Sequence, residues 1–295
     1  MKELLRKKNL KTVFLLLLLC AATALLCTCV QKQESSDTAA SAASELTFTD
    51  VNGNSHTYTV NKDAAFHDYD TDLFSANGQF MTYSDSDAYT FSCGIDVSYY
   101  QGEIDWKQIK EAGFDFAFIR IGYRGYGAEG TLNEDERFTE NLSGALEVGL
   151  DVGVYFYAQA ISEEEAAEEA AFVLDLLDDV TLTLPVIYDP EYVLDEDGNK
   201  LSQARTSTID GDQITQNTLS FCNAMENAGY ETGFYANMLF EALVLDMAAL
   251  SEYTVWYADY EDTPQTPYAF SYWQYSDSGK IDGIEGSVDL NIRLF

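Results

Sequence analysis

Residues 116–122 read Phe-Ala-Phe-Ile-Arg-Ile-Gly, and residues 152–158 read Val-Gly-Val-Tyr-Phe-Tyr-Ala. Both runs are rich in the apolar, β-branched and aromatic residues that favour buried strands. The sequence between them has helical character over Arg137–Val148 and then reaches Gly149, a residue type expected just after a helix end. A strand, a helix and a second strand in this order predict a unit of parallel sheet.

The same alternation extends outward over residues 93–295. The expected strands are Gly94–Val97, Phe116–Gly122, Val152–Ala158, Pro185–Asp189, Thr232–Ala236, Thr254–Asp259, Ser271–Tyr275 and Val288–Asn291. The expected helices are Trp106–Ala112, Arg137–Val148, Glu163–Leu177 and Thr215–Ala228. Eight strands fit a closed barrel. We therefore predict an α/β fold, an irregular TIM-like β/α barrel of about five β/α units plus three closing strands, because the last links are too short for full helices.

Composition narrows the classes of function. The chain has 295 residues, of which 46% are hydrophobic, and its 16 Lys+Arg against 50 Asp+Glu give a net charge of −34. This charge disfavours binding to nucleic acid phosphates. The only histidines are His56 and His67. The chain after residue 67 therefore lacks a histidine base for a Ser-His-Asp or Cys-His enzyme, and we expect no metal site, so the chemistry should depend on carboxylates.

The first 30 residues predict export. Residues 1–11 are basic, and residues 12–30 carry no charge, as in a signal sequence. A lipoprotein signal with Cys29 as the lipidated residue and a retained membrane anchor both remain open, and both are favoured over a cleaved signal that releases the protein. Residues 31–45 predict a flexible linker that holds a domain at the outer face of the membrane.

Residues 46–92 form a separate segment before the barrel. Alternating residues flank Asn52-Gly53, a strong hairpin indicator. The segment is too poor in aliphatic residues to fold alone, so we expect a small N-terminal β appendage that packs on the barrel at 93–295. An independent binding role is the less favoured alternative.

Acidic residues recur where the predicted strands end. Asp96, Asp189, Glu191 and Asp259 follow this rule, and Asp289 falls within the last strand. Because the carboxyl ends of parallel barrel strands share one face, we expect these groups to meet there. Tyr123, Tyr157, Tyr235, Asp259 and Gln274 are the expected substrate contacts.

Asp189-Pro190-Glu191 is the most informative of these positions. Residues i and i+2 of an extended segment point to the same side, so both carboxylates should face one cavity. Two nearby acids cannot both ionise freely, and one can stay protonated as a general acid. Glycosidic bond cleavage needs this division of roles. The alternative is a solvated turn, which the apolar Val186-Ile187-Tyr188 run disfavours.

Other motifs are less informative. The glycine-rich residues 122–127 lack the Lys-Ser/Thr of a phosphate loop, and we expect Tyr123 and Arg124 near the cavity rim. Residues 195–199 resemble a calcium loop only in part, so we expect an exposed turn. Cys93 and Cys222 either pair or remain free.

Several motifs together resemble the glycoside hydrolase family 25 lysozymes. They are Gly94-Ile-Asp-Val-Ser98, Gln101-Gly-Glu-Ile-Asp-Trp106, Phe118-Ile-Arg-Ile-Gly-Tyr123, Gly153-Val-Tyr-Phe-Tyr157, Tyr188-Asp-Pro-Glu191, Gly233-Phe-Tyr-Ala-Asn237, Tyr272-Trp-Gln-Tyr-Ser276 and residues 279–291. The resemblance covers residues 93–295. It departs from many members at Phe156 and at Tyr99-Tyr100, where a histidine is common.

The resemblance implies an N-acetylmuramidase that cuts the β-1,4 bond between N-acetylmuramic acid and N-acetylglucosamine in peptidoglycan, without a cofactor. It makes Glu191 the general acid, Asp189 its anionic neighbour, and Asp96 and Asp289 supporting acids. Retention through the substrate's acetamido group and inversion both remain open. We expect a monomer. A catalytically silent wall-binding protein is the alternative; a family 18 chitinase is disfavoured because Ile187 and Pro185 stand where further Asp residues would be needed.

Overall fold

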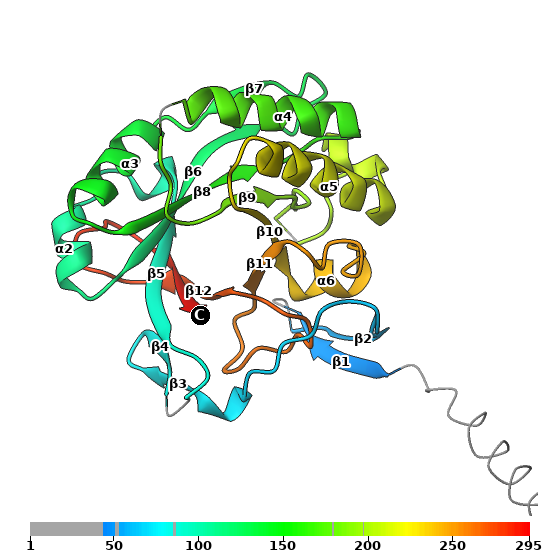
Figure 1. Cartoon of the computed structure of the whole chain (residues 1–295). Coiled ribbons are helices and arrows are strands. Elements are labelled where there is room, and N and C mark those ends of the chain that lie inside the picture. Colours follow the sequence, from blue (N-terminus) through cyan, green and yellow to red (C-terminus); the bar gives the residue numbers. More distant parts are fainter. Residues whose placement is uncertain (1–43, 51–52, 85–86, 179, 197) are drawn as a thin grey trace, which may run out of the picture. The chain divides into compact units, whose positions relative to one another are not determined.

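An eight-stranded barrel forms the centre of this computed structural model, which describes residues 44–50, 53–84, 87–178, 180–196 and 198–295 (Figure 1). Around the barrel the strands follow the order β5 (Phe91–Val97), β13 (Val288–Leu294), β12 (Tyr272–Gly279), β11 (Thr254–Ala258), β10 (Thr232–Asn237), β9 (Val186–Asp189), β8 (Asp151–Tyr157) and β6 (Phe116–Arg124). Pairing of β5 with β6 closes the ring. The predicted barrel and its eight strands are confirmed.

The last strand runs against the others. Neighbouring strands from β5 through β12 pair in parallel, whereas β13 is antiparallel to both β12 and β5. The irregularity predicted for the closing strands therefore includes a reversal of β13. Residues 280–287 form a short link, and a link of this kind joins antiparallel strands, whereas a parallel crossover needs a longer connection. A further short strand, β7 (Leu132–Glu134), pairs with the end of β6 outside the ring.

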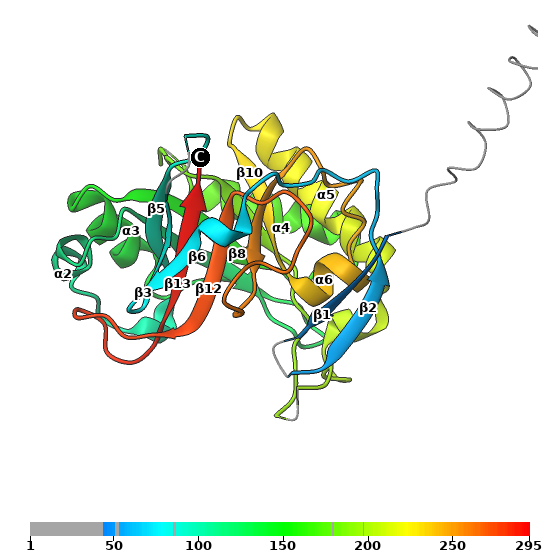
Figure 2. The ribbon, with the colours of Figure 1, turned by 90° about the horizontal axis from the view of Figure 1, so that it is seen from below.

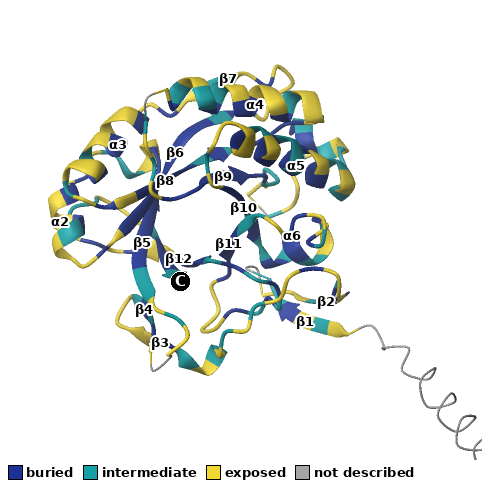
Figure 3. Ribbon diagram, in the orientation of Figure 1, coloured by how far each residue is buried: buried dark blue, intermediate teal, exposed yellow. Residues whose placement is uncertain are grey.

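Helices cover the outside of the barrel, with their exposed faces toward solvent (Figure 3). The four predicted helices are present as α2 (Trp106–Glu111), α3 (Phe138–Glu147), α4 (Glu163–Leu176) and α5 (Gly211–Asn227). Short 3-10 turns lie at η1 (Thr71–Leu73), η2 (Tyr99–Gln101) and η3 (Arg205–Thr208). The helix α6 (Met238–Leu243), which directly follows β10, was not predicted.

Side chains alternate between the two faces of each barrel strand. On β6, Phe116 and Phe118 point into the barrel, while Ala117 and Ile119 join the apolar layer beneath the helices. The rings of Phe118 and Trp256 stack at 4.7 Å inside the barrel. These aromatic side chains fill the interior below the carboxyl ends of the parallel strands, so polar residues one step further along can line an open cavity.

Two small hairpins precede the barrel. The strands β1 (Glu45–Thr49) and β2 (Ser55–Thr59) are antiparallel, as are β3 (Phe74–Asn77) and β4 (Phe80–Tyr83). The predicted N-terminal β appendage is confirmed. Figure 2 shows β1 and β2 beside α6, which β2 contacts. The ring of Phe74 packs edge-on against Trp273 of the barrel at 5.1 Å.

Residues Glu45–Phe295 form one compact unit. The predicted leader (residues 1–30) and all but the last two residues of the predicted linker (31–45) lie outside the described residues. Within the described ranges, no helix combines the length and the apolar composition that a membrane span requires. Cys93 and Cys222 are both buried and free, so they do not pair with each other in this structure.

Candidate active site

Four carboxyl groups meet in one cavity of about 310 Å³ at the open end of the barrel. Asp96 comes from β5, Asp189 from the end of β9, Asp289 from the start of β13, and Glu191 from just beyond β9. Because β13 is antiparallel, its first residues lie at the face where the parallel strands end. The cavity is lined by Asp96, Ser98, Tyr100, Gln101, Arg120, Tyr155, Tyr157, Asp189, Glu191, Tyr235, Trp256, Tyr260, Gln274 and Asp289.

Asp96 and Asp289 form a carboxyl pair across two strands. Their residues are direct partners in the β13–β5 register. Asn291 Nδ2 and Gln274 Nε2 donate to Asp96 Oδ2 at 2.8 and 2.9 Å. Burial raises the pKa of Asp96 to about 6, while these two amide donors oppose the rise. Burial, followed by the charge of Asp96, raises the pKa of Asp289 to about 9, so the proton of the pair resides on Asp289.

Asp189 and Glu191 form the second pair of acids. Burial, then the charges of Glu191 and Asp96, raise the pKa of Asp189 well above its usual range, and Arg120 opposes this shift. Asp189 Oδ1 is buried without a hydrogen-bond partner among the described residues. Burial first, and then the charge of Asp96, raise the pKa of Glu191 to about 7. The cavity can therefore supply a proton from Glu191 near neutral pH.

A hydrogen-bonded glutamine fixes the backbone after β9. Gln159 Nε2 donates to the carbonyl oxygen of Glu191 at 2.7 Å, and Thr206 Oγ1 donates to Gln159 Oε1 at 3.0 Å. Gln159 is fully buried. This chain of contacts holds Glu191 beside Asp189, although Pro190 can donate no backbone N–H of its own.

Arg120 is the one basic side chain among the residues that line this cavity. Its Nε donates to Asp135 Oδ2 at 2.8 Å, and its guanidinium lies over the rings of Tyr99, Tyr100 and Tyr123 at 5.1, 5.3 and 5.3 Å. Its Nη2 group is buried and has no hydrogen-bond partner among the described residues. Arg120 thus places a fixed positive charge beside Asp189.

The structure brings seven of the nine predicted site residues to this cavity: Glu191, Asp189, Asp96, Asp289, Tyr157, Tyr235 and Gln274. Tyr123 is not among the lining residues, and its ring lies beneath the guanidinium of Arg120. Asp259 is also absent from the lining, so its placement with the other acids is wrong. It follows Tyr257 on the outer face of β11, where its Oδ2 accepts hydrogen bonds from Tyr257 and from Gln265 N at 2.7 and 3.0 Å.

The expected position of Arg124 at the rim is also wrong. Its Nε donates to the buried carboxylate of Glu169 on α4 at 2.8 Å, on the outside of the barrel. The register of β6 shifts between Arg120 and Gly122. A bulge of this kind reverses the alternation, so Arg124 points outward although Arg120, four residues earlier, points inward.

Sequence reasoning did not assign Arg120, Tyr155, Tyr260 or Asn291 to the site. Arg120 was detectable, because a charged residue inside an apolar strand needs a polar surrounding. Asn291 was detectable as the residue two positions after Asp289, on the same side of its strand. Trp256 also lines the cavity and donates from Nε1 to Asn291 Oδ1 at 2.8 Å.

Comparison with known proteins identifies the family. The family model described as Glycosyl hydrolases family 25 matches residues 95–284. The chain belongs to glycosyl hydrolase family 25. It is 27% identical over 199 residues to the autolytic lysozyme of Clostridium acetobutylicum, covering 67% of this chain and 54% of that protein. It is 29% identical over 216 residues to lysozyme M1 of Streptomyces globisporus, covering 67% of this chain and 66% of that lysozyme.

Solved structures of other proteins share the fold. The modular autolysin LytC of Streptococcus pneumoniae superposes with a TM-score of 0.60 at 22% identity, covering 86% of this chain and 58% of LytC. A family 25 glycosyl hydrolase from Bacillus anthracis gives a TM-score of 0.54 at 22% identity, covering 74% of this chain and 94% of that one. The chain therefore spans a little over half the length of the Clostridium lysozyme and of LytC.

Proposed function

We propose that this family 25 hydrolase is an N-acetylmuramidase that cuts bacterial peptidoglycan. The observation that carries the proposal is the meeting of Asp96, Asp189, Glu191 and Asp289 in one cavity of a family 25 barrel. Two similar proteins carry the name lysozyme, and a solved structure of LytC contains a synthetic peptidoglycan ligand. The substrate is the β-1,4 bond between N-acetylmuramic acid and N-acetylglucosamine.

Glu191 acts as the general acid. Its raised pKa of about 7 keeps it protonated in a weakly acidic or neutral medium, so it can give its proton to the leaving oxygen as the glycosidic bond breaks. Asp96 supports this role, because its negative charge close by favours the protonated form of Glu191. Asp289 in turn gives Asp96 a hydrogen-bond donor in addition to Asn291 and Gln274.

Asp189 stabilises the positive charge that develops on the sugar. Burial raises the pKa of Asp189 and Arg120 opposes that rise, so Asp189 ionises as positive charge develops on the sugar beside it. Its unpartnered Oδ1 can accept a hydrogen bond from the substrate, for example from an acetamido N–H group. Retention through the acetamido group and inversion by a directed water both fit these residues. Tyr157 on β8 and Tyr235 on β10 line the cavity, and their rings can contact a sugar.

The site acts outside the cell. The leader sequence directs export, and either a lipid on Cys29 or the uncleaved apolar segment holds the protein at the outer face of the membrane. Linker residues 31–45 then let the barrel reach the wall. The protein acts as a monomer.

Digestion of purified peptidoglycan by the full-length chain in detergent tests the proposal, with Glu191→Gln in parallel. Reduction of the products followed by mass spectrometry identifies the new ends. Muramitol ends from the wild type alone support a muramidase with Glu191 as its acid. Glucosaminitol ends would indicate cleavage of the other bond. Wall binding without any released product would favour the catalytically silent binding protein.

A further inference from the structure

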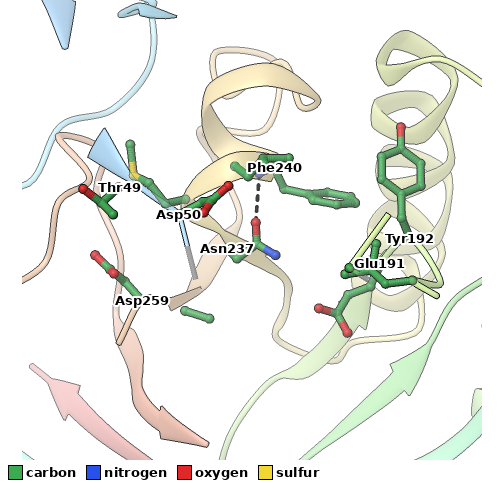
Figure 4. Close-up of a pocket in the computed structure, with 12 residues that line it drawn as sticks. Thr49, Asp50, Glu191, Tyr192, Asn237, Phe240 and Asp259 are labelled. Atoms are coloured by element: carbon green, nitrogen blue, oxygen red, sulfur yellow. Dashed lines mark hydrogen bonds between the residues drawn. The ribbon is translucent and has the colours of Figure 1, made fainter. Parts of the chain in front are cut away.

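A second pocket, of about 130 Å³, adjoins the four-acid cavity and shares only Glu191 with it (Figure 4). Four separate segments build its walls. The end of β1 contributes Thr49 and Asp50, the segment after Glu191 contributes Tyr192, Leu194 and Gly198, and the junctions at β10–α6 and β11 contribute the rest. The β1 residues precede the part of the chain that matches the family model, residues 95–284.

The β1 wall is fixed to the barrel by one glutamine side chain. Thr49 N donates to Gln265 Oε1, and Gln265 Nε2 donates to the carbonyl oxygen of Thr49, both at 2.9 Å. Asp259 orients this glutamine, accepting from Gln265 N at 3.0 Å and from Gln265 Nε2 at 3.2 Å. Asp259, which was expected to contact substrate, therefore lines the second pocket and also holds its β1 wall in place.

The pocket combines an apolar wall with polar groups, which are the amide of Asn237 and the carboxyl groups of Asp50, Glu191 and Asp259. Met238, Leu239, Phe240 and Ala258 supply apolar surface. Asn237 Oδ1 accepts a hydrogen bond from Phe240 N at 3.0 Å, which leaves its Nδ2 group to donate to a ligand (Figure 4). At the rim, Leu194 is 53% exposed although it is a large apolar residue. An exposed apolar residue beside a concave site is typical of a surface that a ligand covers.

We infer that this pocket receives the acetamido group of the sugar on the leaving side of the scissile bond, which is N-acetylglucosamine in a muramidase. The inference rests on the proposed function. A general acid stands between the two sugars that it separates. Since Glu191 alone among the four acids lines both spaces, the pocket lies on the side away from Asp96, Asp189 and Asp289.

The size and chemistry of the pocket fit this group. Its volume is close to that of an apolar cavity of about 150 Å³ that holds one benzene molecule, so it accepts a substituent and not a second sugar ring. The acetamido methyl group meets the apolar wall, and its carbonyl oxygen accepts from Asn237 Nδ2. The N-terminal hairpin and the segment after Glu191 thereby add a subsite for the leaving sugar to the family barrel.

Kinetics on two wall substrates test the inference. The full-length protein is assayed on peptidoglycan with intact N-acetylglucosamine and on peptidoglycan whose glucosamine residues have been enzymatically de-N-acetylated, with muramic acid left acetylated. Leu194→Ala removes the apolar rim, and Thr49→Phe fills the pocket from β1. Leu243→Ala, on a leucine that is 54% exposed on α6, and Thr47→Phe, at an exposed position of β1, are the matched controls because neither residue lines the pocket.

The wild type and both controls should prefer the acetylated wall by about tenfold in kcat/KM, and each pocket variant should lose most of this preference. Equal preferences in all five proteins would overturn the inference while leaving the muramidase proposal intact. Removal of the stem peptides with an amidase is a further arm; a preference that disappears with the peptides would assign the pocket to the peptide and also overturn the inference. A wild type that is inactive on both walls would defeat the proposed function itself, and the inference with it.

Discussion

Asp289 lies directly opposite Asp96 across the antiparallel β13–β5 pair, and one proton between them resolves the repulsion of the two carboxylates. Asp96 accepts from Asn291 and Gln274, so it is the member that the surroundings stabilise as an anion. Asp289 then keeps the proton and donates to Asp96. The pair behaves as one negative charge, and the charge on Asp96 raises the pKa of Glu191, the proposed general acid.

Asp289→Asn should retain activity within about tenfold of the wild type at neutral pH, because an amide NH₂ replaces the proton that Asp289 carries there. Asp96→Asn should lose more than about a hundredfold, because it removes the charge that favours protonated Glu191. Turnover of peptidoglycan by the two variants, measured side by side, checks this order. The opposite order would mean that Asp289 is the ionised member of the pair.

The direction of β13 was the main feature of the fold that the sequence did not reveal. Apolar alternation located each barrel strand, because alternation follows from which face of a strand is buried, but it is the same for a strand read in either direction. Asp289 was nevertheless expected in the site, because the family resemblance assigned it there. It reaches the open face because it stands at the start of β13 and this strand is reversed. Arg124 and Asp259 were misplaced for a similar reason: a single-residue bulge in β6 and the outward side of β11 are set by tertiary packing, which no local pattern records.

Glu191→Gln should reduce turnover by about 10²- to 10⁴-fold while leaving the fold unchanged, because glutamine cannot give a proton to the leaving oxygen. In the wild type, kcat/KM should fall as the pH rises through about 7, where Glu191 loses its proton. The residual activity of the variant should lack this alkaline limb. Rates across the pH range, with circular dichroism as the check on folding, provide the measurement.

Arg120→Met should move the acidic limb of the pH–rate profile to higher pH. Arg120 lowers the pKa of Asp189, so without it Asp189 needs a less acidic medium to ionise. We expect a loss of about tenfold to a hundredfold in kcat/KM at mildly acidic pH and a smaller loss at alkaline pH. Arg137→Met is the matched control, because Arg137 pairs with Glu140 at the surface of α3. An equal loss at every pH would assign Arg120 to substrate binding alone.

Glu241→Gln should stabilise the protein in alkaline medium. Glu241 is 2% exposed on α6, and burial raises its pKa to about 8, with Asp259 adding to the rise and Thr266 opposing it. Because the folded state holds this proton more tightly than the unfolded chain, folding stability falls as the pH rises from about 4.5 to about 8. Glutamine has no such proton, so the stability of the variant should not fall in this way.

The difference in Tm between Glu241→Gln and the wild type should therefore grow with pH, reaching at least about 2–4 °C in favour of the variant above pH 8. Thermal unfolding followed by circular dichroism at several pH values measures it. Glu140→Gln, at a surface position on α3, is the control that should show no such trend. If the two variants differ from the wild type by the same amount at every pH, Glu241 is ionised in the folded protein throughout, and the α6 region tolerates a buried charge.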